Sequence, residues 1–366
     1  MLSPLAYKIA LTQIPHIGPV LAKNLLGYCG SAEAIFSEKE PKLLKIPGIG
    51  KKHAKLIAQF KDFAKAESEA EYITKNNINL LFFSDAAYPR HLKHIADAPI
   101  LLYGQGKMDC NNSYMVGIVG TRKATEQSKE ICAQIVADLL PYNCTIVSGL
   151  AYGIDIAAHK AALQNNMQTI GVLAHGLDMI YPTENAPTAK KMLKNGGLLT
   201  EYPSKTNPDR ENFPTRNRIV AGMCDALIVI ETDVKGGSMI TAEIAFSYNR
   251  DVFAVPTWPS SKKLSGCNWL IKNNKAALIE NGLDVATMMG WELNSTSPKI
   301  KTFTLPENLN EQEKTIANIL QTNALGIDEI ASQANVPLNK VSLTLLELEL
   351  RGLVKSLPGK VYKLSI

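Results

Sequence analysis

The chain has 366 residues, of which 46% are hydrophobic and 20% charged, and its formal net charge is +5. This composition is typical of a globular protein with two or three domains and argues against a fibrous or disordered chain. No stretch approaches the ~18 apolar residues of a membrane span, and the first residues do not form a secretory signal. We therefore expect a cytoplasmic protein without a membrane partner. The six cysteines form no CxxC pair, so neither a zinc site nor a disulfide framework is predicted.

Residues 1–80 predict a domain of short helices with two similar turns. Ile14–Pro19 and Ile46–Lys51 each place a proline and a glycine before a helical stretch. The second turn resembles a helix-hairpin-helix motif, in which glycines let backbone N–H groups approach a DNA phosphate. The possible DNA contacts are Gly48, Gly50, Lys51 and Lys52. The alternative is a turn that serves only packing or a protein contact.

Residues 81–290 predict an α/β core. Apolar strands alternate with amphipathic helices over residues 125–141 and Asp155–Asn165, which indicates a doubly wound parallel sheet. The expected strands are Tyr114–Val119, Cys144–Val147, Thr169–Ala174, Ala226–Ile230 and Val252–Val255. Residues 80–112 look like a connector with one weak strand.

The C-terminal part begins with a polar, proline-containing stretch, residues 291–309, which is typical of a linker. Residues 310–366 then predict three helices and a hairpin, the pattern of a winged helix. This segment holds six Lys/Arg against six Asp/Glu. A domain that reads a DNA groove usually carries more positive charge, so we favour a protein-interaction role for the tail.

Glycine-rich turns follow the first two core strands. Gly120, Thr121 and Arg122 end the first, and Ser148, Gly149 and Gly153 follow the second. Such turns before a helix can bind phosphate. However, no acid ends the second strand to bind a ribose diol, which argues against a nicotinamide or flavin cofactor, and we expect none. Asp155 could simply cap the following helix.

Two further clusters follow later in the core. Phe213, Arg216, Asn217 and Arg218 combine phosphate-binding arginines with an aromatic ring that could stack on a base. Lys235, Gly236, Gly237 and Ser238 follow a buried strand and open a helix, like a phosphate cradle. In an open α/β sheet all four clusters would meet along one crevice. Several phosphate sites in a row suit a nucleic-acid strand better than a single nucleotide.

The order of these motifs resembles the DNA-processing protein A (DprA/Smf) family. The matching strings are GTR, SGLAYGID, HGLDMIYP, TEYP, FPTRNRIVAG, KGGSMITAEIA and SGCNWLIKNN, preceded by YPRHL and DAPILLYGQG. The resemblance implies a Rossmann-like core that binds single-stranded DNA in a basic pocket, without catalysis. It also implies protection of incoming DNA and loading of the RecA recombinase during natural transformation, and a homodimer formed through the core.

An enzyme is the alternative. KGGSMITAE also resembles the signature of nucleoside-monophosphate phosphoribohydrolases, with Glu243 at the position of their catalytic acid. The sequence has Ser-Met-Ile-Thr where that signature has Gly-x-Gly-Thr, and Glu243 could be a helix-dipole acid. A third interpretation, compatible with the first, is a scaffold that binds the recombinase.

Overall fold

The computed structural model describes residues 2–258, 265–293, 309–320, 324–357 and 361–364. The chain divides into two compact units, Met1–Ser297 and Pro298–Ile366. Most of the linker predicted for residues 291–309 lies outside the described residues. Among the described residues, no helix has the length and apolar character needed to cross a membrane.

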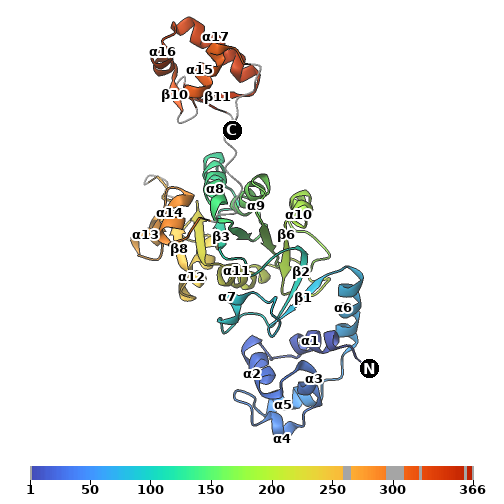
Figure 1. The fold of residues 1–366 in the computed structure, drawn as a ribbon. Coiled ribbons are helices and arrows are strands. Elements are labelled where there is room, and N and C mark those ends of the chain that lie inside the picture. Colours follow the sequence, from blue (N-terminus) through green and yellow to red (C-terminus); the bar gives the residue numbers. More distant parts are fainter. Residues whose placement is uncertain (1, 259–264, 294–308, 321–323, 358–360, 365–366) are drawn as a thin grey trace. The chain divides into compact units, whose positions relative to one another are not determined.

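The first unit is built around one nine-stranded sheet with the order β1-β2-β6-β5-β4-β3-β7-β8-β9 (Figure 1). The strands are β1 Asn79–Phe82, β2 Leu101–Lys107, β3 Met115–Gly120, β4 Thr145–Ser148, β5 Thr169–Val172, β6 Gly196–Thr200, β7 Ala226–Ile230, β8 Asp251–Ala254 and β9 Ala277–Leu278. All pairs from β6 to β9 are parallel, whereas β2 runs antiparallel to both β1 and β6. The predicted parallel, doubly wound sheet is confirmed, with an antiparallel edge added.

Helices cover both faces of this sheet, as doubly wound parallel sheets require. On one face lie α8 Glu126–Asp138, α9 Ile154–Gln164 and α10 Ala186–Met192; on the other lie α7 Arg90–Lys93, α11 Asn212–Met223 and α12 Gly237–Ser247 (Figure 1). Two further helices, α13 Gly266–Lys272 and α14 Gly282–Met288, lie at the β9 end of the sheet. All five residues of β7 are buried, which explains its continuous apolar sequence.

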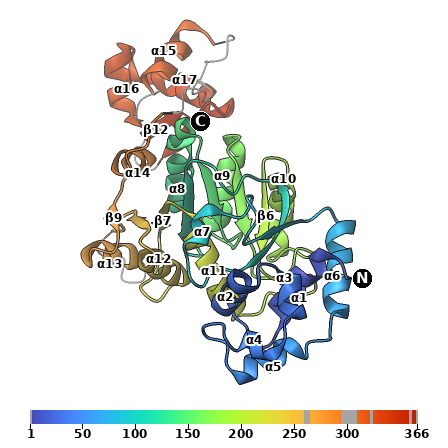
Figure 2. The same ribbon diagram turned by 60° about the horizontal axis from the view of Figure 1, so that its bottom comes forward.

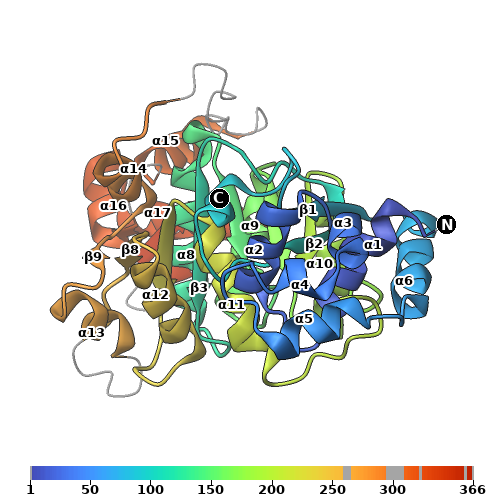
Figure 3. The ribbon, with the colours of Figure 1, turned by 90° about the horizontal axis from the view of Figure 1, so that it is seen from below.

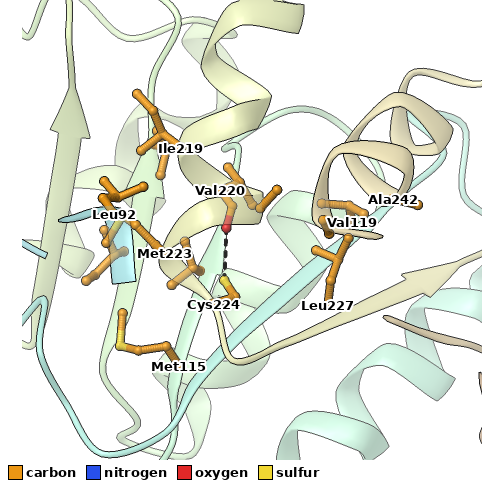
Figure 4. Packing of buried hydrophobic residues seen from close by; sticks show 14 of the residues in the cluster. Leu92, Met115, Val119, Ile219, Val220, Met223, Cys224, Leu227 and Ala242 are labelled. Carbon is orange, nitrogen blue, oxygen red and sulfur yellow. Dashed lines mark hydrogen bonds between the residues drawn. The ribbon is translucent and has the colours of Figure 1, made fainter. Parts of the chain in front are cut away.

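The helix α11 is anchored in the core beneath the sheet. Figure 4 shows Ile219, Val220 and Met223 among buried side chains of β3, β7 and α12, and Cys224 Sγ donates a hydrogen bond to Val220 O at 3.0 Å. Because close-packed interiors resist deformation, this anchoring holds the N-terminal half of α11 in a defined position.

The N-terminal helices pack on the β1–β2 edge of the sheet (Figures 2 and 3). They are α1 Pro4–Gln13, α2 Pro19–Cys29, α3 Ala32–Ser37, α4 Glu40–Leu43, α5 Lys51–Ala58 and α6 Ala64–Lys75. Polar contacts fasten them: Glu69 Oε1 accepts from Ser204 N at 2.9 Å, and Lys23 Nζ donates to Ile95 O at 2.7 Å. The domain boundary that the sequence suggests at residue 80 falls within β1, which belongs to the core sheet.

The second unit has its own hydrophobic core. It consists of α15 Glu311–Ile319, α16 Ile327–Ala334 and α17 Leu338–Leu350, with a three-stranded sheet of β10 Leu325–Gly326, β12 Val361–Leu364 and β11 Val354–Leu357. The three helices and the hairpin agree with the predicted winged helix, and β10 adds a strand that the sequence did not indicate.

Three strands of this sheet are missed by the sequence pattern: β2, β6 and the two-residue β9. The region of β2 looked like a connector, and β6 was not expected at all. The reason is composition, since β6 begins Gly196-Gly197 and β2 contains Gly104 and Gly106, and glycine depresses strand propensity.

Candidate nucleic-acid interface

A hollow of about 630 Å³, here called the strand-end pocket, opens where β3, β4 and β7 end. It brings together members of all four predicted clusters. The predicted residues that line it are Gly120, Thr121, Arg122, Gly149, Phe213, Arg216, Asn217, Gly236, Gly237 and Ser238. The structure therefore confirms that these turns meet at one edge of the sheet.

One face of α11 forms a wall of the pocket. Phe213, Arg216, Asn217 and Val220 all line it, and their spacing of three, four and seven residues places them on one side of a helix. The Arg122 guanidinium carbon lies 5.2 Å from the centre of the Phe213 ring, a cation–π distance. The sequence thus sets an exposed cation against an aromatic ring at the mouth of the pocket.

Arg216 lies at the bottom of the pocket and is only 4% exposed. Its Nη1 donates to Val172 O at 2.5 Å, and its Nε has no partner among the described residues. A Cβ on Gly149 would come within 2.1 Å of Nη1, so glycine is required there to admit the guanidinium. The glycine that the sequence assigns to phosphate binding thus makes room for an arginine.

Asp155 is the buried counter-charge of Arg216. Burial raises the pKa of the Asp155 carboxyl, and the positive charge of Arg216 opposes that rise. Burial likewise lowers the pKa of Arg216, which Asp155 opposes, yet a guanidinium remains charged in proteins. The carboxylate also accepts a long contact of 3.4 Å from Ala151 N, which precedes the helix. The helix-cap interpretation is wrong, because Gly153 is the N-cap of α9 and no side chain caps that helix.

Gly153 organises the pocket rim through its backbone. Its φ is +78°, and a Cβ there would lie 2.0 Å from Thr121 O. This close approach allows Ile154 N to donate to Thr121 O at 3.2 Å, while Thr121 N donates to Glu231 O at 2.8 Å. Gly153 therefore holds the turns after β3 and β4 together and lies outside the lining of the strand-end pocket.

The N-terminus of α12 faces the pocket through Gly236, Gly237 and Ser238. No side chain caps this helix, and nothing lies within 4 Å of a Cβ built on Gly237. The Ser238 hydroxyl is instead bonded to Thr232 Oγ1 at 2.6 Å. The unobstructed space at Gly237 and the positive end of the α12 dipole together favour the binding of an anion.

Besides Gly153, three predicted site residues lie outside the lining of the strand-end pocket, which corrects the sequence-based set. Ser148 is buried and its Oγ donates to Ile118 O at 2.5 Å. Arg218 forms an ion pair with Glu201 and donates to Asp97 O at 2.8 Å, because a residue two positions after Arg216 lies on the far side of a helix. Lys235 does not line the strand-end pocket but a neighbouring hollow beside α12 and α13, which shares Gly236 and Ile240 with it.

The pocket also contains residues that the sequence did not single out. Arg210 is exposed and lines it, three positions before Phe213. Tyr181 lines it too, with its ring centre 6.1 Å from that of Phe213. The signal for Tyr181 was the HGLDMIYP string, which follows β5 and so must lie at the same edge of the sheet. Asp233 contributes an exposed carboxylate to the lining.

The helix-hairpin-helix residues lie in the N-terminal helices, away from the strand-end pocket lining. α5 begins at Lys51 with Gly50 as its N-cap and without a side-chain cap. Lys51 and Lys52 are exposed, whereas Gly48 packs close to Leu21. The turn therefore presents uncapped amides and two lysines to solvent.

Glu243, the acid of the alternative enzyme interpretation, is not in the strand-end pocket. It lines the hollow with Lys235 and forms an ion pair with Lys275 at 2.8 Å. Glu243 therefore lies beside the Lys235–Gly236 turn, but outside the pocket that contains Arg122 and Arg216. Among the described residues, no cluster of three His, Cys, Asp or Glu side chains could hold a metal ion.

A parallel α/β sheet with a basic, aromatic pocket at its strand ends, flanked by two small helical modules, defines a modular nucleic-acid-binding protein. Family models match all three parts: DNA recombination-mediator protein A over residues 79–290, a DprA winged helix domain over 302–360, and a SAM-like helix-hairpin-helix tandem over 8–60. The chain belongs to the family of DNA recombination-mediator protein A.

Relatives and solved structures agree. The chain is 33% identical to protein Smf of Synechocystis over 98% of each chain. It resembles the X-ray structure of DNA processing protein A from Streptococcus pneumoniae with a TM-score of 0.67 and 33% identity, covering 79% of this chain and 99% of that one. It also resembles DNA processing protein A from Helicobacter pylori, studied for its single-stranded DNA binding mode, with a TM-score of 0.53, 30% identity, and 59% and 97% coverage.

Proposed function

We propose that this protein binds single-stranded DNA in the strand-end pocket, without catalysis, and mediates recombination. The observation that carries the proposal is the convergence of Arg122, Arg210 and Arg216 with the Phe213 ring and the open start of α12. Arginines and helix amides bind phosphates, and an aromatic ring stacks on an unpaired base whatever its sequence. The Helicobacter relative's single-stranded DNA binding supports the same assignment.

Membership of the DNA recombination-mediator family supports a proposal for the biological role. We propose that the protein protects incoming single strands in the cytoplasm and loads the RecA recombinase on them during natural transformation. We also propose a homodimer formed through the core. Exposed apolar side chains at the β9 end of the sheet support such a contact, among them Phe246 on α12 and Leu278 on β9.

The pocket is tested with Arg122→Ala and Arg210→Ala, which each remove an exposed cation. We expect each variant to lose about tenfold in affinity for single-stranded DNA and to reduce the slope of log affinity against log salt by about 0.7 per lost phosphate contact. Fluorescence anisotropy with labelled oligodeoxythymidine at two salt concentrations measures both. The control is Lys190→Ala/Lys191→Ala, which removes two exposed cations from α10 that do not line the strand-end pocket. Unchanged affinity in both arginine variants would exclude the pocket as the binding site.

A further inference from the structure

Another hollow adjoins the strand-end pocket on the side of Arg122. It has a volume of about 830 Å³ and runs between α8 and α9, and we call it the helix groove. Arg122 lines both hollows, so the groove begins where the pocket ends. Lys123, Lys129 and Lys160 also line the groove.

The groove exists because its floor is made of small side chains. Ala133 of α8 and Ala157 and Ala161 of α9 lie there, while the longer Lys129 and Lys160 stand at its walls. Along α9, Ile156, Lys160 and Gln164 recur every four residues on one face. The eight residue steps from Ile156 to Gln164 span about 12 Å at 1.5 Å per step. That length fits about three nucleotides at the 3.4 Å spacing of stacked bases.

The charge of the groove is positive and available. Lys123 and Lys160 are exposed, and neither forms an ion pair within the described part of the chain, whereas Lys129 pairs with Glu126 at 2.7 Å. Among the described lining residues the one carboxylate is Glu184, which accepts a hydrogen bond from Tyr152 Oη at 2.7 Å. That bond holds the Tyr152 ring, 42% exposed, at the side of the groove.

We propose that the helix groove binds the continuation of the single strand that occupies the strand-end pocket. Arg122 contacts the phosphate at the junction, Lys123 and Lys160 bind the next phosphates, and Tyr152 offers a ring for a base. This arrangement of lysines along a groove with an aromatic at its side is the general chemistry of sequence-independent single-strand binding. The inference rests on the proposed function, because the strand enters the groove from the pocket.

The test compares oligodeoxythymidines of ~6 and ~20 nucleotides, lengths that span the site sizes of single-strand-binding modules. Lys123→Ala/Lys160→Ala is expected to bind the short oligonucleotide like the wild type. Its affinity for the long one should fall about tenfold, with the salt slope reduced by about 1.4 for two lost phosphate contacts. Lys190→Ala/Lys191→Ala, with the same loss of charge on α10, should bind both lengths like the wild type.

The outcomes separate the two proposals. Equal affinity of the lysine pair variant and the wild type for the long oligonucleotide overturns the groove and leaves the pocket standing. An equal loss for both lengths, or an equal loss in the α10 control, also overturns it, because the lysines would then act through general charge. Failure of the wild type to bind either length would instead overturn the proposed function.

Discussion

Glycines in and beside the strand-end pocket have different structural roles, although the sequence presents them alike. Gly149 makes room for the buried guanidinium of Arg216 and Gly153 for the backbone of Thr121, whereas Gly237 faces open space. A glycine whose missing Cβ faces protein supports the fold, and one whose missing Cβ faces a cavity leaves room for a ligand. This distinction depends on neighbours distant in sequence.

Alanine at Gly149 and at Gly237 separates these two roles. Gly149→Ala should destabilise the protein by about 1–3 kcal/mol through overpacking against Arg216. Gly237→Ala lies in the first turn of α12 and should keep or slightly raise stability, because alanine is the better helix former. It should nevertheless weaken single-strand binding, since its methyl group enters the pocket. Urea unfolding and anisotropy on both variants check this pattern, and a stability loss at Gly237 that exceeds the loss at Gly149 contradicts it.

At the scale of elements, α11 places neighbouring residues of one short motif on opposite sides of a helix, where they have different roles. The FPTRNR string carries Arg216 to the pocket and Arg218 to the opposite side, where it pairs with the buried carboxylate of Glu201. Burial raises the pKa of that carboxyl, and the Arg218 guanidinium opposes the rise.

Arg218 is thus expected to matter for stability and not for DNA. Arg218→Ala should cost about 3–5 kcal/mol, because it leaves a buried carboxylate without its partner. Single-strand affinity of the folded variant should match the wild type. Arg210→Ala, an exposed arginine in the pocket lining, should give the opposite result: normal stability and weak binding. Denaturant titration, with DNA binding measured below the unfolding transition, distinguishes the two variants. A binding defect without a stability defect in Arg218→Ala would contradict this prediction and indicate that Arg218 contacts DNA.

How far the sequence could predict the molecule also depends on elements. Strands with continuous apolar runs, such as β7, could be predicted from the sequence. The meeting of the turns could be predicted as well, because the topology brings the carboxyl ends of parallel strands together. The strands β2 and β6 could not be predicted, because their glycines lower the strand propensity of the sequence. The direction of each side chain in the pocket could not be predicted either. Arg216 and Arg218 point to different sides only because of their positions around α11, and the sequence does not show where that helix begins. Arg210 and Tyr181 were missed because neither belongs to a glycine-rich turn.

At the scale of the whole molecule, the two compact units each have a core of their own. On the second unit, α17 buries Val341, Leu345 and Leu348 while Leu343, Leu346 and Leu350 are exposed. An apolar outer face on the helix that would enter a DNA groove favours the protein-interaction role for the tail.

Separate cores predict separate unfolding transitions. Leu348→Ala removes a fully buried side chain and should cost the second unit about 2–5 kcal/mol, without moving the transition of the first unit. Leu350→Ala, whose side chain is 80% exposed, is the matched control and should move neither transition. Calorimetry of the full chain tests this; a single transition shifted as a whole by Leu348→Ala would mean that the units unfold together.

The fastening of the N-terminal helices to the β1–β2 edge has a consequence for ligand length. Because Glu69 and Ser204 are bonded and buried residues of α1–α6 pack on the strands, Lys51 and Lys52 keep a constant separation from Arg122. A DNA strand that contacts both the two lysines and Arg122 must therefore have a minimum length. Affinity plotted against oligonucleotide length should rise in a step once a strand spans that separation, whereas a loosely tethered head would produce a gradual rise.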